Sequence, residues 1–248
     1  MAREAMKALE WLIRRFKYPT HYLLFSTVNW YRIHQFPVTA ETLLFTFLPY
    51  HREPVYTRLI QIVSLPAHFT FLSQYKDPKS AQSLPPVPLA LLTHNLARDP
   101  VFLETYLNYI HSRAEQHFLP TPATHKYLVL AGETILAMRQ ARVPEETIVS
   151  RIMPFVAAGL RVRGAPELQI ACYSVLAILG CKRTLEGRVL DAAMEAIVLE
   201  WGDESLPSGI LCISSLAYFK DDGGIPVPVK KAILAVKYVW LRGMLLTG

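Results

Sequence analysis

The feature that most constrains the fold is a regular succession of helix-start signals in the second half of the chain. From residue 120 onward, a Thr or Pro precedes each apolar stretch; these residues are Thr121, Pro144, Pro166, Thr184, Pro207 and Pro226. Such residues are favoured where helices begin, because a Thr hydroxyl can cap free N–H groups and proline lacks an N–H. The pattern predicts helices of similar length joined by short loops.

Every second start follows the previous one at a nearly constant interval. Pro144, Thr184 and Pro226 lie 40 and 42 residues apart, and a helix pair repeating every ~40–47 residues has the period of HEAT and armadillo repeats. One such pair cannot bury its apolar face alone, so neighbouring pairs stack into a superhelix. No stretch shows the alternation of a half-buried strand. We therefore predict an all-α chain, an α-α superhelix of the HEAT/armadillo type.

One helical unit occurs twice in the sequence. Residues 41–50 read ETLLFTFLPY and residues 146–155 read ETIVSRIMPF, with Glu, Thr and Pro in the same places and similar apolar residues between them. Proline lacks the N–H that a helix interior requires. We therefore predict that Pro49 and Pro154 bend or end equivalent helices, each the first helix of a repeat.

The apolar residues of the two copies are expected to form buried faces. They occur at i, i+1 and i+4, so each set points at its own partner helix, 55–64 or 167–179. The residues are Leu43, Leu44 and Phe47 in the first copy and Ile148, Val149 and Ile152 in the second. On the same helical wheel, Thr46 and Arg151 are expected to face outward.

Two regions of different regularity are predicted. Residues 1–120 form an irregular N-terminal helical region with an inserted segment at 17–30 and a proline-rich loop at 65–88. The segment 17–30 is aromatic and has no repeat register, so it is either an inserted loop or retained intron sequence. Residues 121–248 form HEAT-like repeats, truncated at the C-terminus because no polar cap follows the last apolar residues. The helix pairs expected in the first region are 41–48 with 55–64 and 89–97 with 100–118.

Composition excludes disorder and a membrane span. Apolar residues make up 52% of the chain and charged residues 19%, which is too apolar for a disordered protein. The uncharged runs at 18–31, 168–181 and 205–219 have 14 or 15 residues, and the longest uncharged run, 80–97, has 18 with three prolines, whereas a spanning helix needs ~20. Three cysteines, Cys172, Cys181 and Cys212, fall in apolar helical stretches. An odd number without close pairs predicts reduced core thiols in an intracellular protein.

The sequence lacks the patterns that carry chemistry. All eight histidines precede residue 126, but none has zinc-site spacing, so we interpret them as helix-end or solvent-facing side chains. Carboxylates are close together at 203–204 and 221–222, where turns favour Asp and Gly for backbone reasons. Nucleophile and phosphate-loop motifs are also missing. We expect no enzymatic activity, no metal, no cofactor and no small-molecule substrate.

Arginines are the candidate contact residues. The net charge is +6, and an RNA contact through phosphates requires a row of Lys and Arg. The residues that could form such a row are Arg139, Arg142, Arg151, Arg161 and Arg163. The alternative, which we favour, is that they are cations near helix C-termini that stabilise the helix dipoles.

Several segments resemble one family. ALEWLIRRF at 8–16, followed by the stretch 33–65 that contains LPYH, resembles the N-terminal part of the U3 small nucleolar RNA-associated protein 10 family, called HEAT repeat-containing protein 1 in animals. IVSRIMPFVAAGLR at 148–161 and PELQIACYSVLAIL at 166–179 are similar to the repeat pattern of this family. No compact set of functional residues defines the family, so none is carried over.

The resemblance implies a scaffold rather than an enzyme. Members of that family are long α-solenoids of the UTP-A subcomplex of the small-subunit processome, where they support transcription of pre-rRNA and its processing to 18S rRNA. The implied partners are the WD-repeat propellers of that subcomplex, the 5′ external spacer of pre-rRNA and the U3 snoRNP, contacted directly or indirectly. The implied location is the nucleus and nucleolus. The alternative function is a HEAT/armadillo adaptor in nuclear transport or vesicle trafficking.

Overall fold

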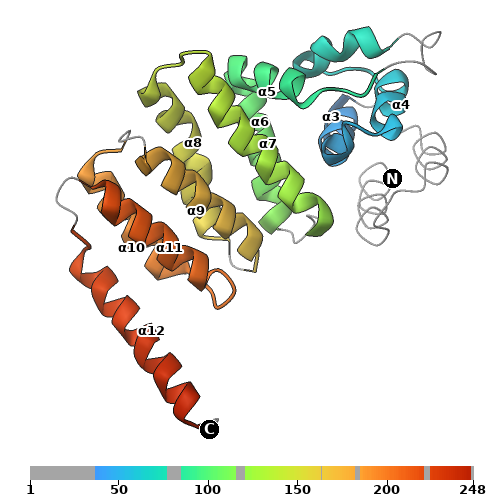
Figure 1. Ribbon diagram of the computed structural model, residues 1–248. Coiled ribbons are helices and arrows are strands. Elements are labelled where there is room, and N and C mark those ends of the chain that lie inside the picture. The colour runs from blue at the N-terminus through green and yellow to red at the C-terminus, as the bar shows by residue number, and fades with distance from the viewer. Residues whose placement is uncertain are drawn as a thin grey trace. The chain divides into compact units, whose positions relative to one another are not determined.

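The chain folds into helices that group into two compact units. The computed structural model describes residues 37–76, 85–115, 121–162, 164–181, 185–220 and 224–246, and every regular element among them is helical (Figure 1). The units are Met1–Val143 and Pro144–Gly248. The predicted all-α fold class is confirmed. None of the helices in the described ranges is long and apolar enough to cross a membrane.

The first unit contains short paired helices. In chain order they are α3 (Pro37–Phe47), the 3₁₀ turn η2 (Leu48–Tyr50), α4 (Pro54–Ile62), the 3₁₀ helix η3 (Ala67–Tyr75), α5 (Leu89–Arg98), α6 (Pro100–Glu115) and α7 (Thr121–Gln140). Helix α3 packs against α4 and α6, and α5 packs against α6 and α7. The two helix pairs predicted in this region are therefore confirmed within the described residues.

The segment predicted as a proline-rich loop is partly helical. Within 65–88, η3 buries Phe69, Leu72 and Tyr75, which are three residues apart and share one face of a helix with three residues per turn. The loop prediction is wrong for these residues, because burial of large side chains orders a stretch that carries proline only at its borders. Residues 77–84 and the proposed insertion at 17–30 lie outside the described part of the chain.

The second unit consists of stacked helical hairpins. Its helices are α8 (Glu145–Leu160), α9 (Pro166–Cys181), α10 (Gly187–Glu200), α11 (Leu206–Phe219) and α12 (Val227–Leu246). Helices α8, α10 and α12 begin 42 and 40 residues apart. Helix α10 contacts both α8 and α12, while α9 contacts α11, so alternate helices form two rows (Figure 1). This arrangement confirms the predicted helical-repeat architecture and its period.

Glycines let the helices of the second unit approach closely. A Cβ added at Gly159 of α8 would lie 2.5 Å from Cys172 Sγ in α9, and one added at Gly180 of α9 would lie 2.8 Å from Leu216 Cδ2 in α11. Both distances are shorter than van der Waals contact allows, so a Cβ at either position would force the facing side chain or the two helices to shift.

A buried glutamine joins the helix ends of neighbouring hairpins. Gln169, in the first turn of α9, donates through Nε2 to the carbonyl oxygens of Leu160 and Glu200, at 3.0 Å each. These are the last residues of α8 and α10, whose final carbonyls have no partner inside their own helices. The Ser205 hydroxyl donates to Gln169 Oε1 at 2.8 Å and accepts a hydrogen bond from the Gly202 N–H at 3.0 Å. One side chain therefore bonds to three groups from two connections, α8–α9 and α10–α11.

The buried faces of the repeated unit are largely as predicted. The side chains of Leu43, Leu44, Phe47, Ile148 and Ile152 are all at most 2% exposed. The predicted partner helices are also confirmed, because α3 packs against α4 and α8 packs against α9. The exception among the six predicted core residues is Val149, which is only half-buried.

One prediction about this unit is wrong, and its two prolines are placed differently. Thr46 was expected to face outward but is 3% exposed; its hydroxyl donates to the Thr42 carbonyl at 2.7 Å and bonds to the Tyr109 hydroxyl at 2.9 Å, so its burial leaves no polar atom unsatisfied. Pro49 does follow the end of α3, but Pro154 lies inside α8, which continues to Leu160. Pro154 is exposed, and the buried residues that follow it keep the helix packed despite one missing hydrogen bond.

The cysteines only partly match the expected core thiols. Cys172 and Cys212 are buried and free, and burial raises the pKa of each thiol to about 12. Both are therefore unreactive thiols at neutral pH. Cys181 is exposed at the last residue of α9, so the core prediction is wrong there.

Truncation of Ile152 tests the buried face of α8. Ile152→Ala is expected to lower the free energy of unfolding by ~2–5 kcal/mol, as other large-to-small core changes do. Arg151→Ala is the matched control on the same turn and is expected to change it by at most ~0.5 kcal/mol. Chemical denaturation measures both. Greater sensitivity at Arg151 than at Ile152 would contradict the placement of α8.

Replacement of Gln169 tests the junction between hairpins. Gln169→Leu keeps the volume but leaves two helix-end carbonyls and the Ser205 hydroxyl without this partner, so we expect a loss of at least about 2 kcal/mol in the free energy of unfolding. Ser174→Ala is the control: this exposed hydroxyl on the same helix bonds only to its own Ile170 carbonyl. An equal response of the two variants would show that the junction does not depend on Gln169.

Candidate functional site

The turn LPYH, Leu48–His51, anchors an extended segment beside it. Leu48 and Tyr50 are buried in η2, and the His51 N–H donates to the Leu48 carbonyl at 3.0 Å. His51 Nδ1 lies 2.6 Å from the Val87 carbonyl oxygen, and the Val87 N–H donates to the His51 carbonyl at 3.1 Å. Because a carbonyl only accepts, Nδ1 must carry the proton. This pair of bonds fixes the segment around Val87 to the turn.

Positive charge surrounds this turn. Burial is the main cause that lowers the pKa of His51 below 6.5; the bond to Val87 opposes this, and the charges of Arg52 and Lys126 lower the pKa further. His51 is therefore a neutral donor at pH 7. Lys126 Nζ also lies 5.1 Å from the centre of the Tyr50 ring, a cation–π contact.

Buried tyrosines hold α7 in place behind the turn. The Tyr106 hydroxyl of α6 donates to the Tyr127 carbonyl, and the Tyr127 hydroxyl of α7 donates to the Thr46 carbonyl of α3, each at 2.8 Å. Burial raises the pKa of both phenols well above the usual 10, so both stay neutral donors. These bonds tie three helices together and position the exposed face of α7.

A groove runs between α7 and the anchored segment. It consists of two adjoining hollows of about 700 and 380 Å³, both of which are lined by Arg52 and Leu89. The larger hollow is bounded by the segment 85–90 and the C-terminal half of α7, and the smaller by the LPYH turn and the N-terminal half of α7. The groove is a concave surface of the first unit, and such surfaces are the usual places for ligands and partners.

The predicted arginines are distributed over two helix ends and one helix middle. Arg139 is in the last turn of α7, and Arg142 follows it in a left-handed turn with φ of 56°. Arg151 is half-buried in the middle of α8, and Arg161 is exposed at its C-cap. Arg163 lies outside the described residues. Ten positions separate Arg151 from Arg161, so they lie about 15 Å apart along α8 and about 80° apart around its axis. A single arginine row remains a prediction, and three of these residues stand where cations stabilise a helix dipole.

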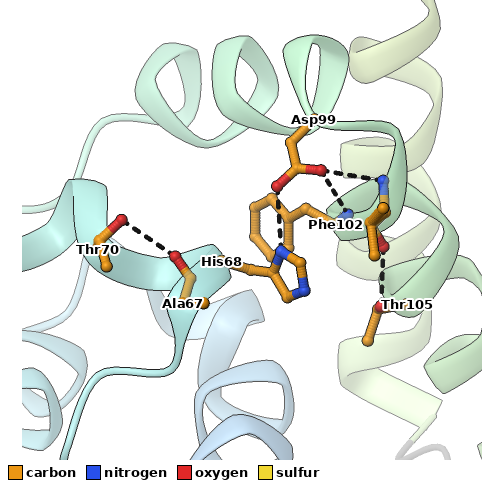
Figure 2. A network of polar contacts seen from close by, with 7 residues as sticks. Ala67, His68, Thr70, Asp99, Phe102 and Thr105 are labelled. Atoms are coloured by element: carbon orange, nitrogen blue, oxygen red, sulfur yellow. Dashed lines mark hydrogen bonds and ion pairs between the residues drawn. The ribbon is translucent and has the colours of Figure 1, made fainter.

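One histidine belongs to a helix cap. Asp99 precedes α6, and its Oδ1 accepts hydrogen bonds from the N–H groups of Val101 and Phe102 at 3.0 and 3.1 Å. Its Oδ2 lies 3.0 Å from His68 Nδ1, and the His68 ring stacks on the Phe102 ring, with centroids 5.9 Å apart (Figure 2). The geometry is that of an N-cap with a second partner. In the described part of the chain, His, Cys, Asp and Glu side chains form no cluster of three that could hold a metal.

Comparison with known proteins places the chain in a family. The sequence profile of U3 small nucleolar RNA-associated protein 10 matches residues 148–245. The curated protein of that name from Aspergillus terreus is 32% identical over 94% of this chain. The proteins of the same name from Neosartorya fischeri and Emericella nidulans are also 32% identical, over 96% and 94% of it. The chain belongs to the U3 small nucleolar RNA-associated protein 10 family.

The similarity covers nearly the whole chain but a small part of each relative. This chain spans 12% of the length of each of these three proteins. The profile match falls within the second unit, whereas the longer alignments also cover the LPYH turn and the groove. Membership in the family therefore rests on both units.

The groove was not found from the sequence. In the sequence, the LPYH turn is only a mark of family resemblance, and the prolines at 85–88 indicate part of a loop. The available signal was the exposed face of α7, where Val129 and Leu136 carry apolar side chains that are 40% and 44% exposed. The segment that faces this side of α7 is held in place by the hydrogen bond between His51 and Val87, which are 36 positions apart in the chain.

The cap at Asp99 predicts a specific pH dependence. Partial burial would raise the pKa of Asp99, but hydrogen bonds from the Phe102 N–H, His68 and the Val101 N–H together lower it below its ordinary value of 3.8. A lowered pKa in the folded state contributes stability above the unfolded pKa, and this is lost as the pH falls. Asp99→Asn keeps an acceptor for the cap, so the difference in unfolding free energy from the wild type should be present above pH 3.8 and shrink below it. A difference that stays constant with pH in urea denaturation would contradict this.

Proposed function

We propose that this chain is a non-catalytic helical-repeat scaffold of the small-subunit processome, within its UTP-A subcomplex, and that it acts in pre-rRNA transcription and processing to 18S rRNA. The observation that carries the proposal is the 32% identity over 94% of the chain to a protein named for its association with U3 small nucleolar RNA. The architecture is compatible with this role, because stacked helical hairpins present extended surfaces on which several partners can assemble.

The proposed partners differ in the chemistry that they require. WD-repeat propellers of the UTP-A subcomplex would contact helix faces and grooves through side-chain packing. The U3 snoRNP and the 5′ external spacer of pre-rRNA would be contacted directly or indirectly, and a direct contact requires cations facing phosphates. Arg142 and Arg161 are the exposed candidates. The proposed location is the nucleolus, and no enzymatic step, cofactor or small-molecule substrate is part of the proposal.

Co-purification tests the proposed function. The full chain, tagged and expressed in fungal cells, is expected to enrich U3 snoRNA and the 5′ external spacer over an unrelated small nuclear RNA, measured by quantitative PCR after mild crosslinking. Propeller proteins of the UTP-A subcomplex are expected in the same eluate by mass spectrometry. Recovery of transport cargo or vesicle coat components without these RNAs would instead favour the adaptor function.

Charge reversal separates direct from indirect RNA contact. If the arginines contact phosphates, Arg142→Glu combined with Arg161→Glu should reduce crosslinked RNA while leaving the propeller proteins bound. If they only stabilise helix dipoles, RNA recovery should not change, and the free energy of unfolding should fall by a fraction of ~1 kcal/mol per site. The two outcomes are measured on the same preparations.

A further inference from the structure

One face of α7 lines the groove along nearly the whole helix. Eight of its residues contribute: Tyr127 and seven more at the three- and four-residue spacing of a single helical stripe. The seven are Lys126, Val129, Leu130, Glu133, Leu136, Ala137 and Gln140. At 1.5 Å per residue, this stripe is about 21 Å long, the length of a helix of about four turns.

Two apolar residues of the stripe, one on each side of Glu133, are accessible. Val129 is 40% exposed and Leu136 is 44% exposed, and Ala137 lies one residue beyond Leu136. Neighbouring apolar side chains that are open to solvent along a concave surface are characteristic of a docking site rather than of a solvated helix face.

The opposite wall favours side-chain packing over strand pairing. Pro85, Pro86 and Pro88 have no N–H to donate, and the N–H and carbonyl of Val87 both bond to His51. A partner strand needs free backbone donors and acceptors along such an edge. From 85 to 88 this wall has no free backbone donor, so it cannot complete a strand ladder, and side-chain packing, as of a helix in a groove, is favoured instead.

The charges that line the groove are balanced and separated along it. Arg52 and Lys126 lie at the end near the LPYH turn, with Glu53 beside them, and Glu133 lies about two turns further along α7. His51, the remaining titratable group of this wall, is a neutral donor at pH 7. Two cations and two carboxylates give no net positive charge, which disfavours a nucleic-acid backbone. A complementary partner carries an acidic group at the Lys126 end and a basic group about 10 Å further on, opposite Glu133.

We propose that this groove binds an amphipathic α-helix of a partner protein. The helix has about four turns, its apolar stripe covers Val129 and Leu136, and its acidic and basic residues pair with Lys126 and Glu133. The proposal rests on the proposed scaffold function, because it names the kind of partner that one surface of the scaffold takes.

Selection from a peptide library tests the proposal. The probe is a phage library of 16-residue peptides with randomised helical sequences, selected against the purified full chain. Enriched peptides are expected to carry apolar residues at i, i+3 or i+4, and i+7, with an acidic residue at one end of that stripe. A synthetic peptide from the selection is then measured by fluorescence anisotropy against variants of the chain.

Matched variants locate the binding. Leu136→Arg is expected to weaken binding at least about tenfold, as loss of a central apolar contact does. Val101→Arg is the control, because Val101 is 54% exposed on α6 of the same unit and does not line the groove; it should change affinity less than about twofold. Lys126→Glu should weaken binding, and a peptide whose acidic residue is replaced by Lys should recover it. Circular dichroism confirms that each variant is folded.

Several outcomes would overturn the proposal. These are the absence of any enriched peptide, equal binding to the Leu136→Arg variant, or enriched sequences without helical periodicity. Tight binding of a 20-nucleotide uridine RNA that is lost in Lys126→Glu would indicate a nucleic-acid site. A concentration-dependent dimer that Leu136→Arg dissociates would indicate a second copy of the chain. Failure here with intact recovery of U3 snoRNA would overturn only this inference and leave the scaffold function standing.

Discussion

Each helical hairpin of the second unit can bury its apolar face only against the next hairpin, and the rest of that unit depends on this constraint. It aligns the helices in two rows, α8, α10 and α12 in one and α9 and α11 in the other. It also brings helix ends together at the junctions, where carbonyl groups lose water and need partners. Gln169 supplies these partners for the ends of α8 and α10. One buried amide therefore provides the hydrogen bonds that stacking of the hairpins makes necessary.

In the first unit, tyrosines supply the hydrogen bonds that buried backbone carbonyls need. Helices α3, α4 and α5 are shorter, with 9 to 11 residues, and the helix contacts of this unit are less regular. Tyr106 and Tyr127 instead combine a large apolar ring with a hydroxyl that reaches a backbone carbonyl of another helix. Thr46 completes the network through the Tyr109 hydroxyl. The groove is a consequence, because α7 is held firmly from one side while its opposite face remains open.

The parts of the structure that sequence reasoning predicted are those set by local signals. Helix starts, the interval between alternate helices and the buried positions of α3 and α8 follow from the spacing of proline and apolar residues within a few turns. Three features that the local signals did not predict depend on distant residues. Burial of Thr46 needs Tyr109, continuation of α8 past Pro154 needs the core beneath Phe155, and the order of η3 needs the aromatic rings of α3 and α6. The groove belongs to the same class, because its two walls come from separate parts of the chain.

The glycines at helix contacts have a consequence for how such a chain can vary. At Gly159 and Gly180 the facing atoms leave no room for even one methyl group. A substitution there would separate the two helices by a fraction of their diameter without unfolding either. In a stacked array each such displacement is passed to all later hairpins, so small changes at the contacts accumulate into curvature. A mutation at Gly159 or Gly180 can therefore change the pitch of the stack.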